Sequence, residues 1–405
     1  MILESEISGV IDQQRQRLNG LTSGLPREIK INTRNLSSHA LIITGIRRCG
    51  KSTLLLQFMQ QNPEGRTLYL NFESPLLYGF SLPDFARLDR IISNTKATTL
   101  LFDEIQLVDK WELYVRQKLD EGYKVIVTGS NASLLSRELG SKLTGRHISQ
   151  ELFPFSFKEF LKFKSFTSSS ESIRQYMQSG GFPEFLKSDD KLQLSTLFDD
   201  ILIRDIVARY GIKDIKSLQK LASYLVSNTG TRVTATKLKQ PLSIGATSTI
   251  LTWFSHLELS YLFSFLPMYS HSVKAQLINP RKIYSIDLGM VDSTSLKSTE
   301  DHGHRLENLV FLHLRREHKE LYYFDNKSSS ECDFVVMENG KVKKLIQVSY
   351  LLTPDNIDRE INGLKEAMLF FNLKRGYIIT LTEKDKIKVD GLEIEVMPAH
   401  ELLGN

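Results

Sequence analysis

The residues best suited to chemistry form a glycine-containing segment near the N-terminus, Gly45-Ile46-Arg47-Arg48-Cys49-Gly50-Lys51-Ser52-Thr53. This segment satisfies the pattern G-x-x-x-x-G-K-[ST] at every fixed position. Its glycines allow backbone N–H groups to wrap a phosphate chain, and the N-terminus of a following helix adds partial positive charge. In this pattern the Lys51 ammonium reaches the β- and γ-phosphates, and the Ser52 hydroxyl binds Mg²⁺. The segment therefore predicts a site for ATP and magnesium.

A pair of carboxylates, Asp103 and Glu104, follows the apolar residues 100–102. We expect Asp103 to hold the magnesium ion, through water, and Glu104 to polarise the attacking water. Two adjacent acids could also form a solvated turn, but the preceding phosphate-binding segment favours a functional pair. A kinase that transfers phosphate to a small acceptor does not need the second acid. Glu104 therefore favours hydrolysis over transfer.

Further polar candidates lie next to later strands. We expect Ser130 or Asn131 to sense the γ-phosphate, with Thr128 as a structural alternative. Arg146 precedes the strand after that, and an arginine at this edge commonly stabilises transition-state charge in a neighbouring subunit. Arg137 is an alternative for this role, and Arg146 could equally be a surface residue. If Arg146 does act between subunits, the protein forms a ring or a dimer.

Short apolar runs separated by helical stretches must position these groups. Three such runs are 41–44, 100–102 and 125–127, while 69–72 resembles a fourth strand and 147–152 is a candidate for a fifth. Runs that are apolar at successive positions suit parallel strands covered on both faces. This alternation predicts a doubly wound α/β domain with its ligand at the C-terminal ends of the strands. In that topology the strand that leads to Ser130 should lie between the phosphate-binding strand and the acidic strand.

The composition is that of a globular protein with several domains. The chain has 405 residues, of which 41% are hydrophobic and 24% charged, and its length suggests about two to four domains. No run approaches the roughly 18 apolar residues of a membrane span, and the N-terminus does not resemble a secretory signal. The two cysteines, Cys49 and Cys332, both lie within motifs, so we expect no structural disulfide. These features indicate a cytoplasmic protein.

The net charge of +5 is distributed unevenly along the chain. Between residues 211 and 282, nine basic and two acidic residues give a local net charge of +7. The basic residues are Lys213, Lys216, Lys220, Arg232, Lys237, Lys239, Lys274, Arg281 and Lys282. Such a segment is typical of a nucleic-acid footprint, and equally of a solvated lysine-rich face.

With these residues placed, the chain resembles the archaeal and bacterial AAA-type P-loop ATPases that carry a C-terminal restriction-endonuclease-like domain of unknown function. The resemblance covers nearly the whole chain. Besides the phosphate-binding segment, it rests on the motifs at residues 101–106, 127–130, 152–157, 180–184, 203–206 and 282–287. Taken together, these motifs are specific to the family. Taken one at a time, only the phosphate-binding segment is specific.

The resemblance implies four domains. These are a P-loop ATPase core (1–154), a helical lid (155–210), a winged-helix module (211–286) and a restriction-endonuclease-like domain (287–405). The residue patterns agree in part, because helical patterns at 217–226, 234–239 and 247–259 precede a β-rich stretch at 261–284. Winged helices bind DNA or mediate protein contacts, and both alternatives stay open here.

The last domain is expected to keep the nuclease-like fold and to lose its catalytic set. That set is a helix glutamate, a strand aspartate and Glu-x-Lys on the next strand, where the carboxylates bind a divalent metal. Glu307 and Asp333 match the first two positions, but Gln347 and Ser349 stand where Glu and Lys should be. A neutral amide binds Mg²⁺ weakly, and serine supplies no positive charge. The lysines at 327 and 344 remain candidates to substitute for the missing one.

Three functions compete at this stage. The leading hypothesis is an ATPase that couples Mg-ATP binding and hydrolysis to action on DNA or a protein partner. The second is a scaffold whose domain arrangement depends on nucleotide occupancy and whose turnover is negligible. The third is an ATP-dependent nuclease, which the substitutions at Gln347 and Ser349 argue against.

Overall fold

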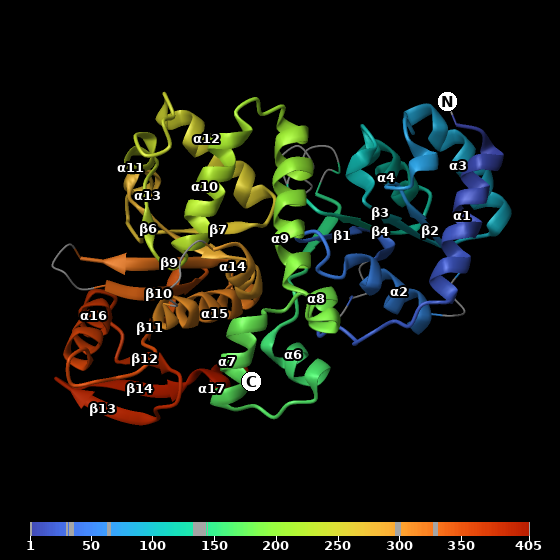
Figure 1. The fold of residues 1–405 in the computed structure, drawn as a ribbon. Coiled ribbons are helices and arrows are strands. Elements are labelled where there is room, and N and C mark those ends of the chain that lie inside the picture. The colour runs from blue at the N-terminus through green and yellow to red at the C-terminus, as the bar shows by residue number, and fades with distance from the viewer. Residues whose placement is uncertain are drawn as a thin grey trace. The chain divides into compact units, whose positions relative to one another are not determined.

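The computed structural model describes residues 2–29, 31, 36–62, 66–132, 143, 145–295, 301–326 and 331–404, without the side chain of residue 277. The chain divides into two compact units, Met1–Phe153 and Pro154–Asn405 (Figure 1). Two of the candidates named above, Arg137 and Lys327, lie outside the described residues. None of the described helices is long and apolar enough to cross a membrane.

A five-stranded parallel sheet forms the centre of the first unit, with strand order β2-β3-β4-β1-β5. Its strands are β1 (Ala40–Thr44), β2 (Thr67–Asn71), β3 (Thr99–Asp103), β4 (Lys124–Gly129) and β5 (His147–Glu151). Strand β4 lies between β1 and β3, as the sequence predicted. The parallel α/β class is therefore confirmed. All five residues of β1 and of β3 are buried, which explains why these runs are apolar at every position.

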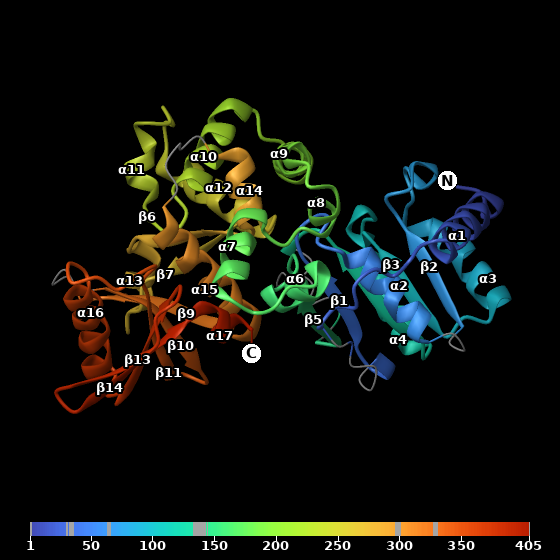
Figure 2. The same cartoon turned by 60° about the horizontal axis from the view of Figure 1, so that its bottom comes forward.

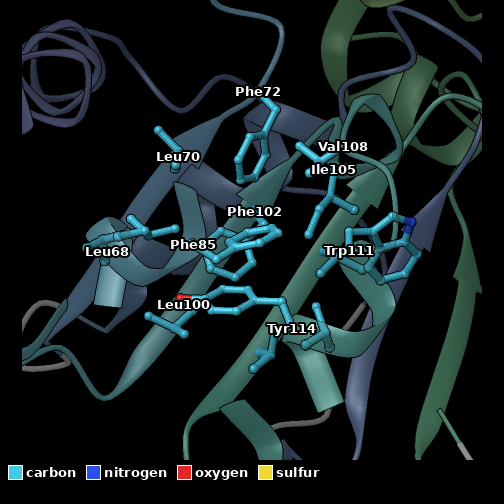
Figure 3. Packing of buried hydrophobic residues seen from close by; sticks show 14 of the residues in the cluster. Leu68, Leu70, Phe72, Phe85, Leu100, Phe102, Ile105, Val108, Trp111 and Tyr114 are labelled. Atoms are coloured by element: carbon cyan, nitrogen blue, oxygen red, sulfur yellow. The ribbon is translucent and has the colours of Figure 1, made fainter. Parts of the chain in front are cut away.

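Helices cover this sheet. They are α1 (Glu4–Asn19), α2 (Lys51–Gln61), α3 (Phe85–Thr95) and α4 (Trp111–Asp120), with short turns η2 (Pro75–Leu77), η3 (Leu82–Asp84) and η4 (Ile105–Leu107). Figure 3 shows alternate residues of the strands, such as Leu100 and Phe102, packed against aromatic side chains of α3 and α4. The Phe85 and Tyr114 rings stack there with centroids 3.8 Å apart. This core fixes the strands whose C-terminal ends carry the candidate site.

Helices dominate the first half of the second unit. They are α6 (Phe157–Lys164), α7 (Ser170–Ser179), α8 (Pro183–Ser188), α9 (Lys191–Asp200), the π-helical η6 (Ile201–Ala208), α10 (Ile215–Ser227), α11 (Ala235–Lys239) and α12 (Thr247–Leu259). A three-stranded antiparallel sheet follows in the order β6-β8-β7, from β6 (Arg232–Val233), β7 (Phe263–Pro267) and β8 (Arg281–Ser285). The stretch that the sequence predicted as β-rich also contains helix α13 (Val273–Ile278).

The rest of the second unit is built on a mixed six-stranded sheet, in the order β13-β14-β12-β11-β10-β9. The strands are β9 (Glu320–Asp325), β10 (Glu331–Glu338), β11 (Lys341–Val348), β12 (Arg375–Thr380), β13 (Asp385–Val389) and β14 (Leu392–Pro398). The helices are α14 (Leu288–Thr294), α15 (His302–Glu317), α16 (Ile357–Phe370) and α17 (Ala399–Leu403). Helix α16 packs against β10, β11 and β12 (Figure 2). From α15 to β12 the elements run helix, three strands, helix and strand, and the hairpin of β13 and β14 and helix α17 follow.

Two of the motifs that carried the resemblance meet inside the second unit. The carboxylate of Asp287, at the start of α14, accepts hydrogen bonds from the backbone N–H groups of Gly181 (2.6 Å) and Met290 (3.0 Å). A Cβ atom on Gly181 would lie 2.4 Å from the carbonyl oxygen of Phe155, so a glycine is needed there. Burial raises the pKa of Asp287 to about 6. These contacts give both motifs a structural role.

Candidate functional site

The phosphate-binding segment forms a tight loop between β1 and α2. Three of its residues have positive φ angles, namely Gly45 (149°), Arg48 (64°) and Gly50 (105°). A Cβ atom on Gly45 would lie 2.1 Å from the carbonyl oxygen of Leu152, so only glycine fits there. Helix α2 begins at Lys51, directly after the loop. The loop therefore ends at a helix N-terminus, an arrangement that favours anions.

The Lys51 side chain is held within this loop. It is 5% exposed, and its ammonium donates to the carbonyl oxygens of Gly45 (3.0 Å) and Ile46 (3.2 Å). The ammonium also lies 3.7 Å from the carboxylate of Glu104. The loop lysine and the second acid of the predicted pair are thus neighbours, although 53 positions separate them in the sequence.

The Asp103 carboxylate is completely buried at the end of β3. It accepts hydrogen bonds from the hydroxyls of Tyr69 (2.7 Å), Thr128 and Ser52. Burial and the nearby charge of Glu104 raise its pKa, against the effect of these three hydrogen bonds. The two predicted magnesium ligands, Ser52 and Asp103, are therefore in contact.

Glu104 has the environment of an ionised carboxylate. Burial would raise its pKa, but the charge of Lys51 and a hydrogen bond from Gln106 outweigh burial, so the pKa is lowered. Its φ angle of 52° is unusual for a residue other than glycine. Such backbone conformations often occur at functional sites. An ionised carboxylate beside the loop can accept a proton from water.

These residues fit a magnesium–nucleotide complex. Mg²⁺ prefers oxygen ligands, and proteins usually hold it by a few side chains together with substrate phosphates and water. Ser52 and Asp103 supply such oxygens next to the loop. Within the described ranges, no group of three or more His, Cys, Asp or Glu residues could hold a metal on its own. The ion would therefore depend on the phosphates of the nucleotide.

Polar residues at the end of β4 and just after it lie near the acidic pair. Thr128, Ser130 and Asn131 are all buried. The Thr128 hydroxyl donates to Asp103 and accepts from the backbone N–H of Glu104 at 3.2 Å. Ser130 hydrogen-bonds the Glu104 carboxylate. Contacts thus place both Thr128 and Ser130 at the acidic pair.

Arg146 is not brought to this loop. It directly precedes β5, whose first residue His147 pairs with Ala40 at the start of β1, whereas Gly45 follows the other end of β1. Its side chain donates to the carbonyl oxygen of Ser38 (3.1 Å) and forms an ion pair with Asp120. Arg146 therefore lies at the opposite end of the strands from Lys51.

Arg27 is a contact of the loop that the sequence did not predict. Its guanidinium donates to the carbonyl oxygens of Cys49 (2.8 Å) and Phe153 (2.7 Å), so it ties the loop to the chain beyond β5. The segment that carries Arg27 is itself anchored by Gln57 of α2, which donates to Ser23 and Leu25 (2.7 and 2.8 Å). Arg27 is far from Cys49 and Phe153 in the sequence, so no local spacing pattern could have predicted its contacts with them.

A second group of predicted residues comes together in the second unit. Glu307, Asp333, Gln347 and Ser349 all line a cavity of about 770 Å³. Gln347 accepts a hydrogen bond from the backbone N–H of Asp333 (3.1 Å) and donates to Glu360 (2.6 Å). The Ser349 hydroxyl donates to the carbonyl oxygen of Leu351 (2.9 Å). Both residues that replace the expected catalytic pair are thus engaged in hydrogen bonds within the protein.

Lys282 lies at the centre of this group. Its ammonium is 2.8 Å from the carboxylate of Glu307 and 2.7 Å from that of Asp333, and it forms an ion pair with Glu331. The lysine comes from β8, which the sequence assigned to the preceding domain. By contrast, Lys344 is exposed on β11. The only sequence signal for Lys282 was its place at the start of the 282–287 motif.

Comparisons with known proteins agree with the fold of the first unit. Residues 37–161 match the AAA domain, residues 170–301 match a domain of unknown function (DUF8612), and residues 302–402 match another (DUF4143). The chain is 35% identical over 389 residues to the uncharacterized protein MJ1544 of Methanocaldococcus jannaschii. This alignment covers 88% of this chain and 86% of MJ1544. It is 32% identical over 378 residues to an uncharacterized protein of Haemophilus influenzae, covering 87% and 92% respectively.

Among solved structures, the chain is similar to AMPPCP-bound DnaA from Aquifex aeolicus. The match has 16% identity and a TM-score of 0.28, and it covers 64% of this chain and 89% of that one.

Proposed function

Because the chain belongs to the family of AAA-domain proteins that includes MJ1544, we propose that it is an Mg-ATP-dependent ATPase. ATP binds in the loop between β1 and α2, and its hydrolysis is coupled to action on a partner macromolecule. Domain boundaries at residues 154, 210 and 286 remain part of this proposal.

Each site residue has a role that follows from its contacts. The Lys51 ammonium binds the β- and γ-phosphates, and the loop N–H groups hold the phosphate chain. Ser52 and Asp103 hold the magnesium ion, which neutralises phosphate charge when it is bound. Glu104 orients the attacking water and accepts its proton. Ser130, which hydrogen-bonds Glu104, links that carboxylate to the end of β4.

The observation that carries the proposal is the position of the Glu104 carboxylate, which lies beside the loop lysine and is hydrogen-bonded to Ser130 and Gln106. A binding site alone requires the loop and Lys51, whereas hydrolysis also requires a group that activates water. An ionised carboxylate 3.7 Å from the Lys51 ammonium meets that requirement. A scaffold with negligible turnover has no need of such a group.

The proposal is tested by equilibrium binding of a fluorescent ATP analogue in the presence of Mg²⁺. Lys51→Ala should lose most of the affinity, because the ammonium that binds the β- and γ-phosphates is removed. Lys124→Ala is a matched control, since Lys124 is exposed at the start of β4, away from the loop. Equal affinities for Lys51→Ala and the unmodified protein would contradict the proposed site.

The partner is proposed to contact the segment 211–286, which we infer to be a winged-helix module. The helix order α10, α11, α12 and the sheet order β6-β8-β7 support this inference. The segment's charge of +7 favours DNA as the partner. Two of its nine basic residues, Arg232 and Lys282, are however paired with carboxylates of the second unit and so add little to the surface charge.

Helix α12 favours a protein as the partner over DNA. In winged-helix and related DNA-binding modules the second helix of the helix-turn-helix reads the major groove, usually with cationic side chains. Helix α12 contains no lysine or arginine, and its exposed residues include Ser248, Leu251, Thr252 and Ser255. Such a face suits a protein better than a polyanion. The rate of ATP hydrolysis with and without DNA separates the two candidates.

We also propose that Arg146 acts on the ATP of a neighbouring subunit, so that the active form is a homo-oligomer. Its place at the far end of β5 keeps it away from the loop of its own chain. Turnover by mixtures of Lys51→Ala and Arg146→Ala proteins tests this. Each variant alone should be inactive, and mixing should restore part of the activity, because a mixed interface joins an intact loop to an intact arginine. Full turnover by Arg146→Ala alone would exclude this role.

A further inference from the structure

We propose that the ammonium group of Lys282 takes the place of a divalent cation within the carboxylate cluster of the second unit. On this proposal the cluster of Glu307, Glu331 and Asp333 binds no metal ion, and the lysine joins β8 to α15 and β10. This inference is independent of the ATPase function proposed for the first unit.

The position of Lys282 is the first argument. A restriction-endonuclease-like fold implies a divalent ion held between a helix glutamate and a strand aspartate. Here the point between Glu307 and Asp333 is filled by a lysine nitrogen, at 2.8 and 2.7 Å from their oxygens. Lys282 is 4% exposed and ion-pairs with a third acid, Glu331. A metal ion could bind these oxygens only if the ammonium moved away.

The remaining hydrogen bonds of the cluster are the second argument. The Glu307 carboxylate also accepts from the Tyr284 hydroxyl (2.6 Å), and the second oxygen of Asp333 accepts from the backbone N–H of Val348 (2.9 Å). Gln347, where a third metal-binding carboxylate is expected, is held between Asp333 and Glu360. With the Lys282 ammonium in place, the carboxylates of Glu307, Glu331 and Asp333 all have partners within the protein, and the residues present do not fit a divalent ion.

The charge of Lys282 is the third argument. The ammonium is enclosed by three acidic side chains, those of Glu307, Glu331 and Asp333. Displacing it would leave a buried charge without its partners, which is strongly unfavourable.

The cluster also joins two sheets of the second unit. Lys282 lies on β8 of the three-stranded sheet, whereas Glu331 and Asp333 lie on β10 of the six-stranded sheet. Arg232 on β6 adds a parallel connection, because it forms ion pairs with Asp325 and Glu331. The cluster thus connects the proposed winged-helix module to the C-terminal sheet.

Electron paramagnetic resonance of Mn²⁺ tests this proposal on the full-length protein without nucleotide. The unmodified protein and Asp333→Asn should bind the same number of ions, because Asp333 holds no metal. The variant Lys282→Met should gain one bound ion, and the double variant Lys282→Met/Asp333→Asn should not. Lys344→Met is the matched control, since this lysine is exposed on β11; it should bind as the unmodified protein does.

Two results would overturn the proposal. One is a bound ion in the unmodified protein that Asp333→Asn or Glu307→Gln removes. The other is a folded Lys282→Met protein, judged by near-ultraviolet circular dichroism, that gains no ion. If Lys282→Met does not fold, the comparison of the unmodified protein with Asp333→Asn and Glu307→Gln still decides whether the cluster holds a metal.

Discussion

At the scale of single residues, Arg27 extends the candidate site beyond the loop pattern. Its guanidinium joins the carbonyl oxygens of Cys49 and Phe153, and so holds the loop against the chain beyond β5. It lies ahead of residues 37–161, which match the AAA domain. We therefore regard Arg27 as a positioning residue for the proposed ATP site.

Replacing Arg27 should weaken nucleotide binding. We expect Arg27→Ala to lower the affinity for a fluorescent ATP analogue about tenfold, because hydrogen bonds from a charged group contribute roughly 1.5–3 kcal/mol. Arg27→Lys should recover part of the loss, since it keeps the charge and one donor. Arg15→Ala, on the exposed side of α1, is the control. Unchanged affinity in Arg27→Ala would remove this residue from the site.

The sequence predicted the residues of the site that belong to local patterns. Lys51 and Ser52 follow the loop glycines, and Asp103 and Glu104 end a buried strand, so spacing alone identified them. Arg27 and Lys282 could not be found in this way. Each reaches its contacts across tens of residues, and no local pattern records which distant lysine or arginine the fold will bring to a loop or a carboxylate.

At the scale of elements, the junction between α7 and α14 depends on glycines and on Asp287. Gly289 lies in α14, and a Cβ atom there would be 2.3 Å from the carbonyl oxygen of Ser179. We expect Gly289→Ala to destabilise the second unit by about 1–3 kcal/mol, because the added atom has no room. Chemical denaturation would measure this change.

Gly9→Ala is the matched control for that substitution. Gly9 is an exposed helical glycine of α1 with no atom near its Cβ position. The same chemical change should there stabilise the protein by up to about 1 kcal/mol, because alanine is the better helix former. A similar effect of both substitutions would show that close packing at Gly289 is unimportant.

The buried Asp287 should make stability depend on pH. Its pKa is about 6 in the folded protein and near 3.8 when unfolded. The folded state therefore holds the proton more tightly than the unfolded state does. The contribution of Asp287 to the free energy of unfolding is fully present below about pH 4 and is lost as the pH rises through 6. The loss amounts to about 3 kcal/mol. Asp287→Asn should remove this part of the pH dependence of the free energy of unfolding, measured by chemical denaturation at several pH values. The same pH dependence in Asp287→Asn and in the unmodified protein would contradict this assignment.

Most elements could be predicted because their patterns are strong. Strands β1 and β3 are apolar at successive positions because they are buried on both faces of the sheet. The hairpin of β13 and β14 was missed, although Asp390-Gly391 is a typical turn and Leu392, Ile394 and Val396 alternate with polar residues. Strand β13 is an edge strand with mostly exposed or half-buried residues, so its own pattern is weak. Helix α13 lies within a stretch predicted to be β-rich, because it has only six residues and Ser272, which caps it, is the one local signal of its start.

At the scale of the whole molecule, the two units divide the proposed work. The first carries the nucleotide site, and the second carries the proposed partner-binding module and the Lys282 cluster. The sequence suggested a nucleic-acid footprint from the charge of residues 211–282. The structure lowers the number of basic residues available to nucleic acid, because Arg232 and Lys282 are paired with carboxylates. These pairs are tertiary contacts, which composition does not reveal.

This distribution of charge leads to a prediction about DNA. At about 0.15 M salt, where exposed charges are screened beyond roughly 8 Å, duplex DNA should leave the rate of ATP hydrolysis unchanged. The reason is that α12 offers no cation to the major groove. A several-fold stimulation that Lys237→Glu/Lys239→Glu abolishes would instead identify DNA as the partner and α11 as its contact.

The central claim is that Glu104 activates water for hydrolysis of ATP held by the loop. Its most direct test is the steady-state rate of phosphate release by Glu104→Gln, with nucleotide affinity measured on the same sample. We predict unchanged affinity and a rate lower by about 100-fold or more, as expected for loss of a general base. Glu121→Gln, at the far end of α4, should behave as the unmodified protein. A Glu104→Gln protein that releases phosphate at the unmodified rate would contradict the account.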